Sequence, residues 1–351
     1  MPKPGPRLRL VDVAERAGVS LATASRALAG REGVSEEVAR HVRQVSRELG
    51  YVANPYARTL AGGASSTVGL VVHQVDDPYF SEIAGGVIQV AAEEGLLVQI
   101  CHSGRDPDNE LQQLRHLIAQ RVGIILIAGS GYNDPRIEAA ARAELSEFQR
   151  GGGRVAVIGR HALGVDAVLP ENEAGGRALA EHLLDLGHRR IAVAAGTAAL
   201  TTVADRLAGV SAALGRHGLA LADLPVVHCD FTRDGGRAAA EQILREHPET
   251  TAIIALNDAM AIGVLSTLRA HRVPVPERMS VVGFDDVSVA ADLAPSLTTI
   301  RLPMTDMGRM ALGLALKPRA ARPRRRSTGH SLVVRDSTAP APTPDRDRDR
   351  G

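Results

Sequence analysis

Residues 10–28 read LVDVAERAGVSLATASRAL and decide how the N-terminal part of the chain folds. Apolar residues recur at helical spacing in the first half of this stretch, which predicts a short amphipathic helix. Gly18 then tolerates positive φ, and the Ser20 hydroxyl can accept hydrogen bonds from the free N–H groups of a following helix. That second helix, residues 21–28, carries Arg26 on a polar face. A helix, a glycine turn and a capped helix are the layout of a helix-turn-helix, whose second helix enters the DNA major groove.

An ordinary helical hairpin inside a core would have the same spacing. Two features argue against it: one face of the second helix is too polar and too small for burial on both sides, and basic residues precede the element. Residues 1–60 contain 10 Lys and Arg against 6 Asp and Glu, whereas the remainder contains 31 against 34. A modestly basic head fits contact with a polyanion. Ser35 and Gly50 are expected to cap the two ends of a third helix, which completes a small head.

The stretch 10–28 closely resembles the DNA-binding head of LacI/GalR-type bacterial repressors. The resemblance implies that Leu21, Ala22 and Arg26 face base edges. Arg26 can donate two hydrogen bonds to a guanine, whereas Leu21 and Ala22 offer apolar contact alone. Hydroxyls suited to phosphate contacts, which position the helix without specifying sequence, belong to Ser20, Thr23 and Ser25. The last two have an alternative explanation as capping or solvated groups.

Residues 54–61, NPYARTLA, predict a helix of about two turns, with Asn54 as its cap and Pro55 at its first position. Because so short a helix is marginal in water, we expect it to become ordered on DNA. In the family this segment is the hinge helix, and the resemblance assigns Asn54 and Leu60 to the DNA interface. An apolar wedge such as Leu60 kinks the duplex at the minor groove. The alternative is a plain linker, which is how we interpret residues 62–66.

From residue 67 onward, β-branched runs alternate with helical patterns, and the alternation starts again past residue 170. Continuous apolar strands separated by helices imply parallel sheets covered on both faces. The pattern therefore predicts two α/β lobes, and it resembles the type I periplasmic-binding-protein-like effector domain of the same family. The strands we expect are residues 68–72, 98–100, 123–127 and 155–158 in the first lobe, and residues 190–195, 226–227, 252–256 and 279–284 in the second.

The resemblance also gives the domain limits that we expect. The C-terminal tail, residues 339–351, has an Asp-Arg repeat typical of a solvated, disordered segment. This tail lacks the heptads of a tetramerisation helix. The limits are residues 1–53 for the head, 54–66 for the hinge helix and linker, 67–166 and 298–326 for the N-lobe, 167–297 and 327–338 for the C-lobe, and 339–351 for the tail.

Ligands of α/β sheets bind beyond the carboxyl ends of the strands, and two lobes present those ends to one cleft. The resemblance implies an effector there, which we expect to be a sugar. Carboxylate, amide and guanidinium groups can engage its hydroxyls while aromatic rings cover its apolar face. The residues that the resemblance assigns to the effector are Tyr79, Phe80, Arg160, Leu200, Thr202, Arg206, Phe231, Asn257 and Asp285.

Several of these positions carry alternatives. Phe80 is equally explained as a core residue of its lobe. Arg160 follows a glycine where relatives often have aspartate, so one acidic hydroxyl acceptor is missing, and Leu200 makes its wall of the cleft apolar. Asp258 and Asp286 are equally explained as helix caps, and for Asp258 we favour the cap.

Other classes of protein leave no signature in this sequence. Phosphate-loop, HExxH and nucleophile-elbow motifs are missing, so we expect no catalysis, no cofactor and no metal. Cys101 and Cys229 are too few for a disulfide framework, and the N-terminus lacks a signal-peptide pattern. We therefore expect a cytoplasmic, ligand-responsive repressor that binds a pseudo-palindromic operator as a homodimer, without a membrane. The alternatives are a solute-binding receptor without DNA function and an α/β enzyme.

Replacing Leu60 with alanine tests the hinge assignment. Loss of the wedge should weaken operator binding strongly, because an intercalated side chain supports the bend that brings more protein onto the duplex. Gel-shift titration measures this, and circular dichroism checks that the fold is intact. An unchanged operator affinity would refute the wedge.

Overall fold

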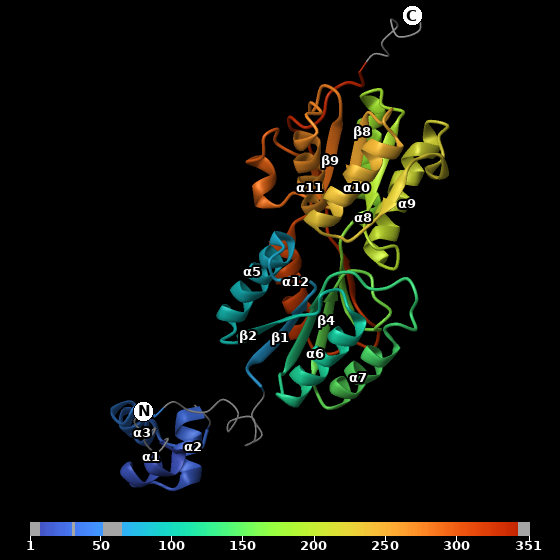
Figure 1. Ribbon diagram of the computed structural model, residues 1–351. Helices are drawn as coiled ribbons and strands as arrows, with labels where there is room; N and C mark the ends of the chain where they lie inside the picture. The colour runs from blue at the N-terminus through green and yellow to red at the C-terminus, as the bar shows by residue number, and fades with distance from the viewer. Residues whose placement is uncertain (1–7, 30–31, 52–64, 343–351) are drawn as a thin grey trace, which may run out of the picture. The chain divides into compact units, whose positions relative to one another are not determined.

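The computed structural model describes residues 8–29, 32–51 and 65–342, and the chain divides into two compact units at Ser66 (Figure 1). The hinge segment, with Asn54 and Leu60, lies outside the described residues, so the predictions for it stay predictions.

The first unit is a small helical head with its own apolar core. Thr23 donates its backbone N–H to Ser20 Oγ at 3.1 Å, and Val38 donates to Ser35 Oγ at 3.4 Å, so both predicted N-caps are confirmed. Gly50 ends the last helix in the left-handed conformation, at φ 67°. The helices of the head are α1 (Leu10–Arg16), α2 (Leu21–Ala29) and α3 (Glu36–Leu49). Their core consists of Val13, Ala14, Ala17, Ala24, Ala27, Ala39, Val42 and Val45.

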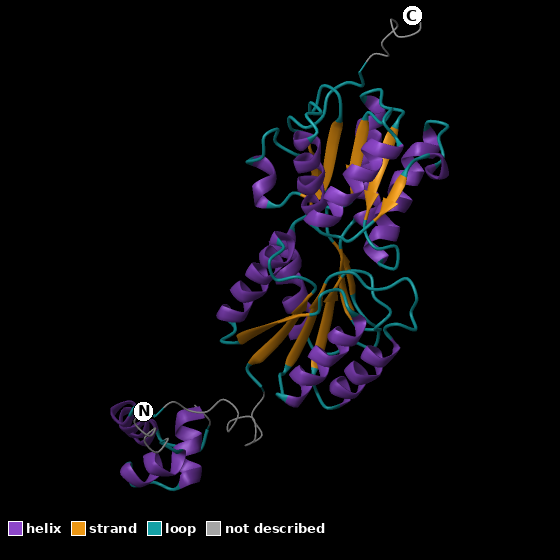
Figure 2. Cartoon of the chain, viewed as in Figure 1, coloured by secondary structure: helices purple, strands orange, loops and turns teal. Residues whose placement is uncertain are grey.

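The first lobe of the second unit contains a six-stranded parallel sheet in the order β11-β5-β4-β3-β1-β2 (Figure 2). Helices α5 (Pro78–Glu93) and α12 (Met304–Leu316) cover one face, and α6 (Pro107–Ala119) and α7 (Ala139–Arg150) cover the other. Its strands are β1 (Thr67–Val72), β2 (Leu97–His102), β3 (Ile124–Ala128), β4 (Arg154–Ile158), β5 (Asp166–Leu169) and β11 (Arg325–Ser327).

The second lobe repeats this plan in the order β12-β10-β9-β8-β6-β7, with β12 antiparallel to its neighbour. Helices α8 (Asn172–Asp185) and α9 (Thr201–Arg216) cover one face, and α10 (Arg233–Glu246) and α11 (Asp258–Ala270) cover the other. The two lobes and the helical head confirm the predicted fold class. The strands of this lobe are β6 (Ile191–Ala195), β7 (Val226–His228), β8 (Ala252–Ala255), β9 (Ser280–Asp285), β10 (Thr298–Arg301) and β12 (Ser331–Val333).

The chain crosses between the lobes later than the sequence indicated. Residues 166–169 belong to the first sheet, because β5 pairs with β4 and β11. Residues 298–301 belong to the second sheet, because β10 pairs in parallel with β9. The expected return to the first lobe at Thr298 is therefore wrong, and the crossing follows Arg301.

The expected tail also begins too early. Ala339 O lies 3.0 Å from Nε2 of the buried His188, and Ala341 donates its N–H to Leu186 O at 2.8 Å. Residues 339–342 are thus hydrogen-bonded to the second lobe. Residues 343–351 lie outside the part of the chain that the structure describes.

Helices α5 and α12, far apart in sequence, pack backbone against backbone on the first sheet. A Cβ on Gly86 would lie 1.9 Å from Thr305 O, and a Cβ on Gly308 would lie 2.1 Å from Ile83 O. Glycine at both positions is what permits this approach. The contact fixes α12, which the chain reaches by crossing from the second lobe, against the first lobe.

Matched alanine substitutions in α5 test this packing. Gly86→Ala should lower the free energy of unfolding by ~1–3 kcal/mol, because the new methyl overlaps a backbone carbonyl. A Cβ on the adjacent Gly85 would have nothing within 4 Å, so Gly85→Ala should raise stability by ~0.5–1 kcal/mol through helix propensity. Urea denaturation of both variants measures the difference, and equal effects would contradict the close approach.

Candidate functional site

Helix α2 presents an outward face that matches the predicted DNA-reading residues. Leu21, Ala22 and Arg26 are exposed, with Leu21 at 52%, whereas Ala24 and Ala27 on the opposite side are buried in the head core. Two of the hydroxyls predicted to reach phosphate are engaged with each other. Ser20 Oγ and Thr23 Oγ1 lie 2.8 Å apart, which supports the alternative explanation of Thr23 as part of the cap.

A small cavity lies between the two lobes of the second unit, at the carboxyl ends of the parallel strands. Eight of the nine side chains predicted to meet an effector line it: Tyr79, Phe80, Leu200, Thr202, Arg206, Phe231, Asn257 and Asp285. Its volume is about 30 Å³, which suits one or two water molecules, whereas pockets for drug-sized ligands usually have several hundred Å³. A sugar therefore enters only if the lobes move apart.

Arg206 is buried at the back of this cavity and all its nitrogens are engaged. Nε donates to Asn172 Oδ1 at 2.9 Å, Nη2 donates to Asp285 Oδ1 at 2.8 Å, and Nη1 donates to the carbonyl of Leu256. The guanidinium carbon lies 3.6 Å from the centre of the Phe284 ring. Arg206 thus joins three parts of the second lobe, the start of α8 and the ends of β8 and β9.

Asp285 ends β9 at a φ of 115°, a backbone conformation that costs energy for a residue with a side chain. Burial raises the pKa of its carboxyl to about 7, against the opposing effect of Arg206. Asp286 follows at a φ of 58°. It is not a cap, because its carboxylate pairs with Arg301 at 2.6 Å and with Arg335 at 2.7 Å.

The cap of α11 is Asn257, not Asp258 as we favoured. Asn257 Oδ1 accepts the backbone N–H of Met260 at 2.8 Å. Asp258 is fully buried inside the lobe, where it accepts from Thr299 Oγ1 at 2.6 Å and from the N–H of Val287 at 2.9 Å. Spacing alone did not separate two adjacent polar residues at the start of one helix.

Aromatic rings approach the cavity from both lobes. Tyr79 and Phe80 lie in the first turn of α5, which Asp77 caps by accepting the N–H of Tyr79 at 3.0 Å. Phe80 is 4% exposed, so it is also a core residue of its lobe. Phe231 comes from the loop after β7, and it fits because Gly196 has no Cβ, which would lie 2.0 Å from the Phe231 ring.

Arg160 is the predicted effector residue that does not line the cavity. Its guanidinium points to Asp205 on α9, with Nη2 at 2.5 Å and Nε at 3.1 Å from the carboxylate. This partly exposed ion pair joins the lobes beside the cavity. The preceding residue, Gly159, does line the cavity, whereas the carboxylate of Asp205 on the facing lobe holds the Arg160 side chain outside it.

Hydrogen bonds also join the lobes directly. Thr201 donates its N–H to Gly131 O at 2.9 Å, and Thr202 donates its N–H to Ser130 Oγ at 2.9 Å. Asn133 donates its N–H to Ala199 O at 2.8 Å. The loop after β3 and the start of α9 therefore form a seam that closes one side of the cavity.

Sequence reasoning missed several lining residues, all on the first lobe or its loops. They follow strand ends, so applying the strand-end rule to every predicted strand would have found most of them. The missed side chains are His73, Arg105, Ser130 and Pro170.

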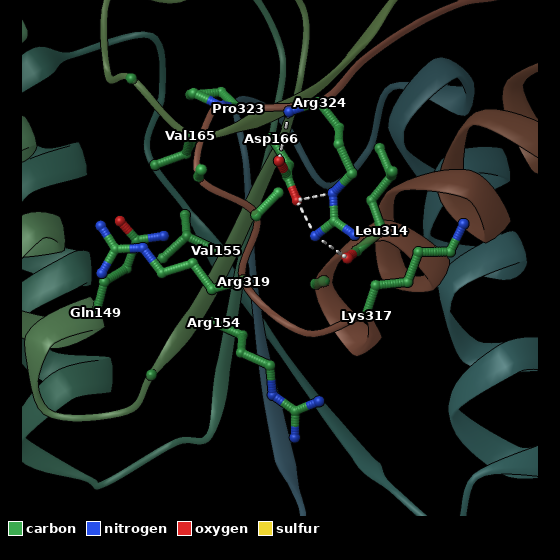
Figure 3. A pocket seen from close by; sticks show the side chains of 15 residues that line it. Gln149, Arg154, Val155, Val165, Asp166, Leu314, Lys317, Arg319, Pro323 and Arg324 are labelled. Atoms are coloured by element: carbon green, nitrogen blue, oxygen red, sulfur yellow. Dashed lines mark hydrogen bonds and ion pairs between the residues drawn. The ribbon is translucent and has the colours of Figure 1, made fainter.

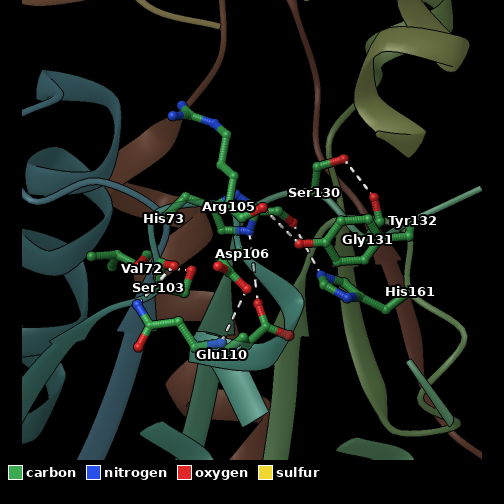
Figure 4. A network of polar contacts seen from close by, with 12 residues as sticks. Val72, His73, Ser103, Arg105, Asp106, Glu110, Ser130, Gly131, Tyr132 and His161 are labelled. Atoms are coloured by element: carbon green, nitrogen blue, oxygen red, sulfur yellow. Dashed lines mark hydrogen bonds and ion pairs between the residues drawn. The ribbon is translucent and has the colours of Figure 1, made fainter. Parts of the chain in front are cut away.

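Behind the cavity lies a buried cluster of titratable groups in the first lobe (Figure 4). His73 Nε2 and Glu110 Oε2 lie 3.9 Å apart, and among the described residues neither atom has a hydrogen-bond partner. Burial raises the pKa of Glu110 to about 7 and lowers the pKa of His73 well below its usual value. His161 Nδ1 lies 2.6 Å from Glu138 Oε1.

A second hollow lies at the outer edge of the first lobe, beside the end of α12 (Figure 3). Its volume is about 230 Å³. Two arginines that line this hollow make contacts within the lobe. Arg324 pairs with Asp166 at 2.6 Å and donates to Leu314 O, and Arg154 donates to Leu316 O. Both stabilise the carboxyl end of α12, so this hollow is a poor candidate for effector binding.

None of the helices in the described part of the chain is long and apolar enough to cross a membrane. Within the same residues, no group of three or more His, Cys, Asp or Glu side chains is arranged to hold a metal ion.

Comparison with known proteins connects these two sites to one family. A model of bacterial regulatory proteins of the lacI family matches residues 9–54, and a model of periplasmic binding protein-like domains matches residues 180–338. The HTH-type transcriptional regulator AscG of Escherichia coli (strain K12) is 32% identical over 87% of this chain and 90% of its own length. The chain belongs to the LacI family of bacterial regulatory proteins.

Solved structures of LacI-family proteins agree with this assignment. A lac repressor dimer bound to operator and an anti-inducer matches with a TM-score of 0.79 and 26% identity, over 95% of this chain and all of that one. A complex of the transcriptional regulator CelR with cellobiose matches with a TM-score of 0.69 and 30% identity, over 94% and 100% of the two chains. This LacI-family protein is therefore a DNA-binding transcription regulator, and the relatives compared are regulators, not enzymes.

Replacing Glu110 with glutamine tests the buried cluster. Because folding raises the pKa of Glu110 from 4.5 to about 7, the folded chain holds a proton that the unfolded chain releases in that window. Stability from this group is therefore lost as the pH rises from 4.5 to about 7. Relative to wild type, Glu110→Gln should gain ~1–3 kcal/mol of stability between pH 5 and pH 8.

Urea denaturation at both pH values measures this gain. Glu93→Gln, at an exposed position at the end of α5, is the matched control, and its difference from wild type should not change with pH. Identical behaviour of the two variants would show that Glu110 is ionised throughout.

Proposed function

We propose that this chain is a repressor whose operator affinity is controlled by a sugar bound between the two lobes, and that it acts as a homodimer in the cytoplasm. The observation that carries the proposal is the combination, in one chain, of an exposed reading face on α2 and a cavity lined by residues able to bind hydroxyls and a sugar ring. Relatives named for cellobiose binding and for a ribose operon support the ligand class.

In this proposal the head reads DNA through Arg26, Leu21 and Ala22. Arg26 supplies paired donors for a guanine, and the two apolar side chains contact thymine methyl groups. Ser20, Thr23 and Ser25 stay candidates for phosphate contacts, and Asn54 with Leu60 for the hinge. Because one head reads few bases, a two-fold dimer on a pseudo-palindrome provides the specificity.

The effector acts by changing how the lobes sit on each other. A sugar that fits the separated lobes replaces contacts of the present cavity and of the seam at Ser130 and Thr202. The chain crosses between the lobes near Arg301, so a change of lobe angle moves α12 and the first lobe to which the head is attached. Two sites coupled through one rearrangement constitute allostery in the strict sense.

Neither rival function explains both sites. A solute-binding receptor accounts for the cavity and leaves the reading face of α2 without a role. The two carboxylates that line the cavity have other roles, since Asp285 pairs with Arg206 and Asp77 caps α5, and the relatives compared are regulators. We infer that the protein is not an enzyme.

The deciding experiment is a gel shift with the intergenic DNA next to the gene, with and without sugars that raise the melting temperature of the full chain. A bound ligand stabilises the protein, so thermal shift selects the sugars to test. A specific shift that a sugar abolishes or strengthens supports the proposal. Binding to a sugar without binding to any upstream fragment would favour the receptor.

Arg26→Ala tests direct reading by α2. Losing a bidentate contact should cost about 1–3 kcal/mol, which is roughly a tenfold to hundredfold loss of operator affinity, while binding to unrelated DNA changes far less. Fluorescence anisotropy with operator and scrambled duplexes measures both. Equal losses on the two duplexes would make Arg26 a phosphate contact instead.

A further inference from the structure

The cavity between the lobes is lined by two arginines that differ in how well they are paired. Arg206, from the second lobe, has a hydrogen-bond acceptor for each of its three nitrogens, one of them the carboxylate of Asp285. Its side chain is 2% exposed. Its charge and its donors are therefore satisfied by the protein itself.

Arg105, from the first lobe, is poorly paired although it is nearly as buried, with its side chain 14% exposed. Within the described residues, its guanidinium donates one hydrogen bond, from Nη1 to the neutral Gln74 Oε1 at 2.7 Å. The nearest carboxylate oxygen there, Asp77 Oδ2, is 3.9 Å from Nη2. That is beyond the range of a charge-assisted hydrogen bond.

The surroundings of Arg105 do not make up this deficit. Asp77 already accepts the N–H of Tyr79, and burial raises the pKa of its carboxyl. His73 lines the same wall of the cavity and contributes no negative charge, because burial and the nearby Arg105 keep it neutral by lowering its pKa. Figure 4 shows the Arg105 side chain extending away from the Glu110 carboxylate.

Aromatic rings instead hold Arg105 at the boundary between the lobes. Its guanidinium carbon lies 6.0 Å from the centre of the Phe80 ring, on the first lobe, and 5.6 Å from that of the Phe231 ring, on the second. Such contacts position a cation without neutralising it. The result is a buried planar fork of donors, facing a cavity where an effector binds, with spare hydrogen-bonding capacity.

We propose that Arg105 recognises a negatively charged group on the sugar effector, either a carboxylate or a phosphate. A buried guanidinium is stable when an anion pairs with it, and its two parallel N–H groups fit both kinds of oxyanion. The donors of Arg206 are already taken by Asn172, Leu256 and Asp285, so the added negative charge is matched by Arg105. This inference rests on the proposed function, because it gives the chemical class of the effector in the same cavity.

Matched sugars separate the possibilities. The full chain is titrated by calorimetry with glucose, glucuronate and glucose 6-phosphate, and with galactose, galacturonate and galactose 6-phosphate. At least one acidic sugar should bind ten times or more tightly than its neutral parent. The uronates and the phosphates distinguish a carboxylate from a phosphate as the group recognised.

Variants then assign the effect to one side chain. Arg105→Met should weaken binding of the acidic sugar by roughly ten- to a hundredfold, and Arg105→Lys, which keeps the charge and loses the fork, should weaken it less. Arg115→Met is the matched control, because Arg115 lies on α6, is exposed and pairs with Glu144 outside the cavity. It should bind as wild type does. Circular dichroism and thermal unfolding check that each variant folds.

Two results would overturn the inference and leave the proposed function standing: a neutral sugar that binds more tightly than its acidic forms and changes operator affinity, or acidic-sugar binding that Arg105→Met leaves unchanged. If no sugar of either kind binds or alters the gel shift, the sugar-effector proposal itself is wrong and this inference falls with it.

Discussion

The approach of α9 to α8 is the constraint on which the second lobe's half of the cavity depends. A Cβ on Gly176 would lie 2.2 Å from the carbonyl oxygen of Arg206, so the two helices meet backbone to backbone at the residue that carries the buried charge. That contact holds the guanidinium where Asn172, Leu256 and Asp285 can accept from it. Removing one partner of a buried ion pair costs about 3–5 kcal/mol, so the packing of two helices and the pairing of one arginine support each other.

The contacts between the lobes are of a different kind. The hydrogen bonds from Thr201 to Gly131 and from Asn133 to Ala199 are between backbone groups, and the ion pair of Arg160 and Asp205 is partly exposed. Exposed ion pairs contribute at most about 1 kcal/mol, whereas the bond from Thr201 to Gly131 is buried, with Thr201 only 2% exposed. The lobes are therefore joined by both buried hydrogen bonds and solvent-exposed contacts, and in the proposed function the effector exchanges those that line the cavity.

The sequence predicted those features that obey local rules. The caps at Ser20 and Ser35 and the turn at Gly50 follow from the chemistry of single residues, and the parallel sheets follow from apolar runs. It failed where a distant partner decides. Arg160 turns to Asp205, which lies 45 residues away, and Asp258 is drawn into the core by Thr299. The strand at Thr298 was assigned to the wrong lobe because pairing with β9 is a property of the fold, not of four residues.

Arg105 and His73 were also missed because their positions in the cavity depend on the folded lobe. The two lobes differ in how far their cavity groups are paired, which affects the specificity of the cavity. The second lobe presents groups that pair with one another: Arg206 donates to Asn172, to Asp285 and to the carbonyl of Leu256, so changing Arg206 removes contacts within the lobe. On the first lobe the Arg105 guanidinium is under-paired, and we propose that an anionic ligand supplies the acceptor that it lacks. A substitution at Arg105 should change which ligands the cavity prefers, acidic or neutral, and leave the hydrogen bonds of Arg206 intact. Selectivity can therefore change on the first lobe while the second keeps the common scaffold, because buried polar groups left without partners discriminate strongly between ligands that do and do not supply them.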